Sequence, residues 1–186
     1  MDQLHMLWPA GQAAPEAALP VEYLLRIFRP SDADAYVAPM HGARFTQWDA
    51  AHLTAELEFV LPDGLFVVEH LRTAALVATA MAEHHASPLH PFGGELGWVA
   101  GDARHAHRGL GRAVCAAVVR RLLAAGYHRI YLKTDDFRLP AITVYLRMGF
   151  VPFLYQADMP ARWQAVCAQL GWPYTPEVWP GGERPQ

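Results

Sequence analysis

The segment ELGWVAGDARHAHRGLGRAV (residues 95–114) connects a predicted strand to a predicted helix through a glycine-containing turn. The apolar run ELGWVAG is typical of a strand, and apolar residues recur at helical spacing from Val114 to Leu122. Gly126 follows where the helix is expected to end, a common position for glycine. The chain therefore passes from strand to turn to helix within about thirty residues.

The turn RGLG (108–111) predicts an anion site at the start of this helix. The first backbone N–H groups of a helix point at one place, and the helix dipole adds partial positive charge there. The two glycines leave the backbone open to an anion, and Arg108 and Arg112 offer direct phosphate contacts. Two better-known phosphate loops do not fit: no Lys-Ser/Thr pair follows the turn, and Val114 replaces the third glycine of the dinucleotide fingerprint.

The rest of the chain alternates strands and helices around this turn, which predicts an α/β (α+β) fold with a mixed sheet. The turn signal PDG (62–64) separates a helix from a strand, and 65–71 with 74–83 form an antiparallel hairpin, although the second run could be helical by propensity alone. Strands are expected over 22–30, 65–71, 74–83, 95–101, 128–134 and 150–156, and helices over 31–43 (capped by Ser31), 46–61, 110–126, 139–149 and 160–171.

Composition indicates one globular domain in a reducing compartment. The chain has 186 residues, 53% of them hydrophobic, and a formal net charge of -3, without the basic face of a nucleic-acid binder. No apolar run is long enough for a membrane span, and the first residues do not read as a signal peptide. The two cysteines do not suggest a disulfide scaffold. We therefore expect a cytoplasmic protein without nucleic-acid or membrane partners.

Three parts are expected along the chain. Residues 1–20, rich in Ala, Pro and Gly, are expected to be a flexible leader. Residues 21–158 form the main domain, and 159–186 a C-terminal helix followed by a Trp- and Pro-rich tail.

Residues 95–155 resemble the GNAT superfamily of acyl-CoA-dependent N-acetyltransferases. The family's central strand leads into a loop of the form Q/R-x-x-G-x-G/A and then a helix, as in residues 95–114. The segment HRIYLKTDDFRLPAITVYLRMGFVPF (128–153) is similar to the family's later strand, tyrosine-bearing helix and Gly-Phe pair. The resemblance implies a mixed, mostly antiparallel central sheet flanked by helices, with N-acetyltransferase activity and acetyl-CoA as co-substrate.

The resemblance also implies which residues bind the coenzyme. The loop amides would hold the pyrophosphate, and the strand, splayed from its neighbour, would align the pantetheine arm and polarise the thioester. Ala106 stands where the family has Gln or Arg, and a register starting at Arg108 fits the letters but shifts the loop by two residues. The candidate residues are Trp98, Val99, Ala100, Ala106, His107, Arg108, Gly109, Leu110, Gly111 and Arg112.

Two residues are candidates for the chemistry. Tyr145 occupies the position of the family's general acid, and aromatic packing on the sheet is its alternative role. Glu95 opens the central strand and could act as general base, or be a solvated strand-end carboxylate. Asp135 and Asp136 are the alternatives for the base, or helix caps.

Ten histidines raise the question of a metal site. Neither the group His84, His85 and His90 nor the pair His105 and His107 is completed by Cys or a carboxylate at a recognised spacing. No metal is therefore expected.

Two classes of acceptor fit the sequence, a small-molecule amine and a peptide N-terminus. Direct attack by the amine is the expected mechanism, with a homodimer as one expected assembly. Two other hypotheses remain open: a non-catalytic acyl-CoA sensor on the same fold, and a structural interaction domain without a ligand.

Overall fold

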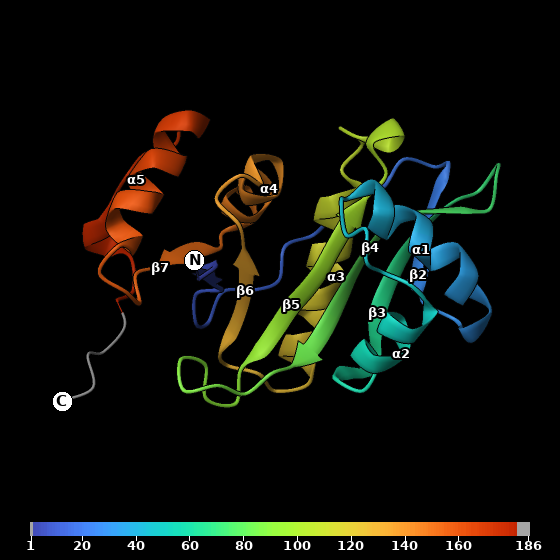
Figure 1. Ribbon diagram of the computed structural model, residues 1–186, viewed down its shortest axis with the longest axis horizontal. Helices are drawn as coiled ribbons and strands as arrows, with labels where there is room; N and C mark the ends of the chain where they lie inside the picture. The colour runs from blue at the N-terminus through green and yellow to red at the C-terminus, as the bar shows by residue number, and fades with distance from the viewer. Residues whose placement is uncertain (1, 182–186) are drawn as a thin grey trace.

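The computed structural model describes residues 2–181, which form a seven-stranded sheet with helices on both faces (Figure 1). The strands follow the order β2-β3-β4-β5-β6-β1-β7, and neighbours are antiparallel except the parallel pair β5 and β6. The strands are β1 Leu4–Leu7, β2 Tyr23–Ile27, β3 Val60–His70, β4 Ala75–His84, β5 Gly94–Gly101, β6 Ile130–Thr134 and β7 Val151–Phe153. The helices are α1 Ala33–Gly42, α2 Ala50–Glu56, α3 Leu110–Ala124, α4 Leu139–Met148 and α5 Met159–Leu170, with 3-10 turns at Pro30–Asp32, Ala103–His105 and Pro176–Val178. This architecture confirms the mixed, mostly antiparallel sheet that the sequence predicts.

The two faces of the sheet carry separate cores, because side chains alternate along each strand. On one face, Val67 and Met81 pack with Tyr36 of α1 and Leu53 of α2. On the other face, alternate strand residues pack against α3, in the same cluster as buried side chains of α4 and α5. The sheet and its helices thus hold the ends of β5 and β6 in fixed positions.

The sheet opens between β5 and β6. These strands pair only through Gly94 with Ile130 and Glu95 with Tyr131, and they diverge beyond that point, as Figure 1 shows. β5 also carries an irregularity opposite β4, where pairing shifts between Thr79 and Met81. Beyond Glu95, the edge of β5 that faces β6 has no strand partner in the part of the chain that the structure describes.

The prediction of a flexible leader over residues 1–20 is wrong for its first part. Leu4–Leu7 form β1, which lies between β6 and β7 and is almost completely buried. Four residues are too few to show a periodic pattern, and the Pro- and Ala-rich sequence after them suggests loose chain. The strand is stable because partners from distant sequence hydrogen-bond to both of its edges.

Other boundaries also differ from the sequence expectation. α2 ends at Glu56, and β3 begins at Val60, so PDG (62–64) lies within a strand as an irregularity of the β3–β4 pairing. The N-cap of α1 is Asp32 rather than Ser31. The predicted hairpin of β3 and β4 is confirmed. Within residues 2–181, no helix combines the length and apolarity needed to cross a membrane.

Candidate functional site

The loop before α3 presents a row of unpartnered backbone amides. His107 and Gly109 have positive φ angles of 61° and 79°, which turn the chain sharply into the helix. Leu110, the first residue of α3, is buried and anchors the turn. Within the described chain, the amides of residues 107–112 have no backbone partner and no side-chain cap. Such a set of amides at a helix N-terminus is suited to bind an anion.

The basic side chains around this loop differ in how firmly they are held. Arg104 makes a close ion pair with Asp102 at 2.6 Å. Arg108 is exposed and lies 3.4 Å from Glu22, a contact that contributes little at the surface. Arg112 is also exposed and forms no ion pair within residues 2–181, so both Arg108 and Arg112 can turn toward a bound phosphate. His105 instead faces inward, where its Nδ1 lies 2.8 Å from the Tyr23 hydroxyl.

A cavity of about 270 Å³ lies where β5 and β6 separate. Its walls include Gly97, Trp98 and Val99 of β5, and the first part of α4 closes another side. β5 lines the cavity, and the loop before α3 follows the end of β5 directly. One continuous stretch of chain therefore connects the cavity to the loop. The remaining lining residues are Gln3, Phe45, Glu56, Glu83, His85, Glu95, Leu96, Lys133, Thr134, Asp135, Arg138, Ala141 and Tyr145.

β5 is irregular at Trp98, which has a positive φ of 47°. Gly97 pairs with Met81 and Ala100 with Thr79, so Trp98 and Val99 together oppose one residue of β4. A bulge of this kind changes the direction of the strand's amide groups. The Trp98 side chain donates a hydrogen bond from Nε1 to Glu56 Oε2 at 3.0 Å, which joins α2 to β5. Ala100 is buried and lies outside the cavity wall.

Tyr145 of α4 lies in the cavity wall and is 5% exposed. Burial raises the pKa of its phenol, so the hydroxyl stays protonated at neutral pH. No hydrogen bond joins this hydroxyl to another residue of the described chain. The geometry thus leaves Tyr145 able to donate a proton to a group in the cavity, and its ring also packs against Phe150.

Glu95 is buried and already engaged. Its Oε2 accepts a hydrogen bond from the Tyr131 hydroxyl at 2.9 Å and lies 3.1 Å from Lys133 Nζ. The sequence suggested Glu95 as a base or a solvated strand end, and the structure shows a paired, buried carboxylate. Both contacts hold the Glu95 carboxylate in place on the wall of the cavity.

Glu83, which the sequence analysis did not consider, lies directly opposite Glu95 in the β4–β5 pair. It is 1% exposed, and Oε1 has no hydrogen-bond partner among residues 2–181. Burial, and then the negative charges of Glu95 and Glu56, raise the pKa of Glu83 to about 9. The available sequence signal was a single carboxylate at the end of an otherwise apolar strand, ALVATAMAEH.

The other acidic candidates have partners. Asp135 accepts a hydrogen bond from Arg138 at 3.0 Å, and it lines the cavity. Asp136 pairs with Arg162 of α5 and does not line the cavity. Asp136 therefore fits a structural role, in which it ties β6 to α5.

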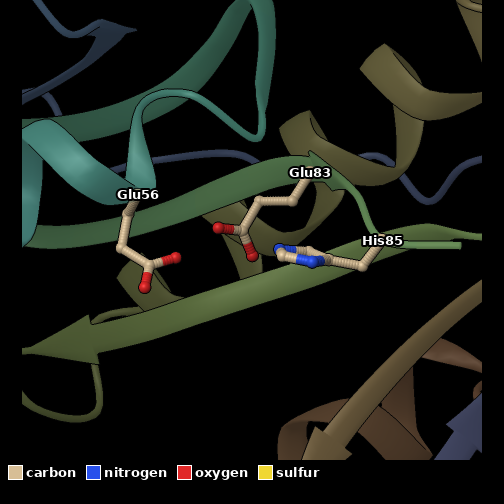
Figure 2. Close-up of side chains that lie close together, drawn as sticks. All are labelled: Glu56, Glu83 and His85. Atoms are coloured by element: carbon tan, nitrogen blue, oxygen red, sulfur yellow. The ribbon is translucent and has the colours of Figure 1, made fainter.

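The histidine groups considered from the sequence do not assemble. His84 is within hydrogen-bonding distance of Tyr127, His90 of His5 and His105 of Tyr23. His85 instead lies beside Glu56 and Glu83, and Figure 2 shows the Glu83 carboxylate between the other two side chains. One ligand atom from each of these residues lies within 4.8 Å of the others.

Comparison with known proteins identifies the family. Residues 22–150 match the model of the acetyltransferase (GNAT) family. A mycothiol acetyltransferase of Pseudarthrobacter chlorophenolicus is 34% identical over 148 residues, which cover 73% of this chain and 45% of that protein. A mycothiol acetyltransferase of Frankia casuarinae is 29% identical over 183 residues, covering 87% of this chain and 50% of that protein. The chain thus spans about half the length of these curated relatives.

Solved structures share the fold. A GCN5-related N-acetyltransferase from Sphaerobacter thermophilus superposes with a TM-score of 0.64 at 18% identity, covering 82% of this chain and 49% of that chain. The structure of AAC(6')-Iy in complex with a bisubstrate analogue, CoA-S-monomethyl-acetylneamine, has a TM-score of 0.56 at 17% identity. The match covers 68% of this chain and 89% of that chain. At these identities the likeness concerns the fold.

Proposed function

Because this chain belongs to the acetyltransferase (GNAT) family and is therefore a transferase, we propose that it moves the acetyl group of acetyl-CoA directly to a primary amine. The observation that carries the proposal is the cavity at the opening between β5 and β6, together with the row of free amides in the loop that follows β5. A long, thin substrate with an anionic group at one end and a reactive carbonyl at the other matches this arrangement.

The loop provides the anion end of the site. The free amides of residues 107–112 would donate hydrogen bonds to the pyrophosphate, and Arg108 and Arg112 would add charge. Ala106 is exposed and offers no polar side chain, so backbone amides carry most of the binding. The unpaired edge of β5 would align the pantetheine arm, and the bulge at Trp98 would direct the Val99 amide toward the thioester oxygen.

Proton transfer would be divided between two walls of the cavity. Glu83 accepts a proton from the attacking amine, directly or through water, in its deprotonated form, which the raised pKa makes dominant only above about pH 9; its Oε1 is free to do so because it has no partner among residues 2–181. The amine nitrogen then bonds to the carbonyl carbon, and the carbon–sulfur bond breaks. Tyr145 donates its proton to the leaving thiolate. Glu95 takes a supporting role, in which it holds Lys133 and Tyr131 in place.

We propose a small-molecule amine as the acceptor. The curated relatives are named mycothiol acetyltransferases, which favours this class over a peptide N-terminus. Glu56 and Glu83 line the cavity, and within residues 2–181 neither pairs with Lys or Arg, although His52 Nε2 lies 3.7 Å from Glu56 Oε1; this wall suits an acceptor that arrives as an ammonium ion.

The coenzyme site is tested by substituting Gly109, which lies in the amide row. Gly109→Asp places a negative charge there, and we expect acetyl-CoA affinity to fall at least tenfold in calorimetry. Gly126→Asp is the matched control, because Gly126 lies at the other end of α3 with a similar φ, 84° against 79°. Equal affinity in a folded Gly109→Asp variant would contradict the loop assignment.

The acetyl transfer itself is tested by measuring free thiol released from acetyl-CoA against a panel of amines. The panel contains small-molecule amines, amino acids and peptides with free N-termini. Release that depends on one class supports the proposal and identifies the acceptor. Tight acetyl-CoA binding without release for any class would favour a non-catalytic acyl-CoA sensor.

A further inference from the structure

Glu56, Glu83 and His85 converge from two elements on one side of the cavity. Glu83 lies near the end of β4, and His85 follows two residues later, so both project from the same face of the chain. Glu56 is the last residue of α2 and approaches from the opposite side, as Figure 2 shows. One donor atom of each residue lies within 4.8 Å of the other two.

Glu83 supplies an independent sign that a cation belongs here. Its side chain is 1% exposed and points into the cluster, yet Oε1 has no partner in residues 2–181. The nearest cation on the opposite wall, Lys133, forms its ion pair with Glu95 instead. A buried carboxyl oxygen without a partner is costly, and a bound cation would displace the proton of Glu83 and pair with that oxygen.

Contacts from neighbouring residues hold the three side chains, and His52 Nε2 lies 3.7 Å from Glu56 Oε1. Trp98 Nε1 donates to Glu56 Oε2, a contact of the kind that orients metal-binding carboxylates. The His85 ring stacks on Phe59 with centroids 4.6 Å apart. Gly97 makes room for Glu83, since a Cβ at that position would lie 1.7 Å from Oε2.

We propose that Glu56, Glu83 and His85 bind a divalent transition-metal cation, with Zn²⁺ as the representative ion. Two carboxylates and an imidazole are ligands that Zn²⁺ prefers, whereas Mg²⁺ and Ca²⁺ favour oxygen alone. Tetrahedral ligands at about 2.1 Å from zinc lie about 3.4 Å apart. Donor atoms within 4.8 Å of one another therefore need to close by at most about 1.4 Å, a movement that the half-buried side chains of Glu56 and His85 can make by rotation toward the buried Glu83.

Metal binding has a consequence for the chemistry, and this consequence rests on the proposed function. A cation bound to Glu83 occupies the lone pairs that would accept the amine proton. Zn²⁺ therefore acts as an inhibitor of acetyl transfer, while the coenzyme loop before α3 remains free.

The test measures Zn²⁺ binding by calorimetry on the full, metal-free chain, with the absorption spectrum of bound Co²⁺ as a second readout. We expect one site, and at least a tenfold loss of affinity in Glu56→Gln and in His85→Ala. Glu58→Gln and His84→Ala are the matched controls, because both residues are exposed and adjoin the cluster in sequence. Acetyl-CoA affinity, measured in parallel, reports on the coenzyme site separately.

Two results would overturn the metal site. One is the absence of Zn²⁺ binding to a folded chain, which would leave a cavity for an organic ammonium ion only. The other is binding that Glu56→Gln and His85→Ala leave unchanged, since other histidines would then hold the ion. Neither result affects the proposed acetyl transfer, which the thiol-release assay decides independently.

Discussion

Gly97→Ala is predicted to slow acetyl transfer by displacing Glu83. An added Cβ would lie 1.7 Å from Glu83 Oε2, 2.8 Å from its Cδ and 3.5 Å from its Oε1, and these are the three nearest atoms. Restoring an ordinary contact of about 3.4 Å requires the carboxylate oxygen to retreat by about 1.7 Å. Gly97 has no positive φ, so alanine introduces no backbone strain and acts through Glu83.

The expected size of the effect follows from this displacement. A misplacement of about 1 Å at a reacting group costs about 10²-fold in rate, so we expect kcat to fall by about that factor. Packing one extra methyl group into the site costs about 1–3 kcal/mol of unfolding free energy, which leaves the protein folded. Acetyl-CoA affinity should change little, because the amide row of residues 107–112 is unaltered.

The assay combines thiol release with the amine found in the acceptor screen and a double-mutant cycle. Glu83→Gln and Gly97→Ala remove the same function, so the double variant should be no slower than Glu83→Gln alone. An unchanged rate in Gly97→Ala would refute the role of Glu83. If the fold-losses in kcat of the two single variants multiply in the double variant, Gly97→Ala slows the reaction by a route that does not involve Glu83.

Two further predictions concern Tyr145 and the buried histidine pair. Tyr145→Phe should lower kcat by about 10²–10⁴-fold with unchanged acetyl-CoA affinity, and an equal rate at every pH would remove Tyr145 from the mechanism. Burial lowers the pKa of His5 to about 4 and of His90 to about 3, below the unfolded value of 6.5. Both rings are neutral in the fold, so their contribution to stability is complete above pH 6.5 and lost as pH falls toward 4. Urea unfolding at pH 7 and pH 5 should show this loss in the wild type and less of it in His90→Gln; equal pH dependence of the two would contradict the assignment.

The loop of free amides before α3 was predictable because it is local in sequence. The strand, glycine turn and helix of residues 95–126 follow one another, so hydrophobic spacing and glycine positions indicate a row of free amides. Tyr145 became a candidate through the resemblance of residues 128–153 to the family, whose tyrosine-bearing helix precedes a Gly-Phe pair. The loop depends on neighbours along the chain, so the sequence alone determined it together with the mixed sheet.

The cluster of Glu56, Glu83 and His85 depended on tertiary contacts. Glu83 has an unusual environment because cross-strand pairing places it opposite Glu95, and α2 brings Glu56 close to it. β1 was missed because four residues become a central strand only when β6 and β7 hydrogen-bond to its edges. Burial, charge pairing and the pairing of β1 between β6 and β7 depend on residues far apart in sequence. Local sequence patterns therefore do not predict them.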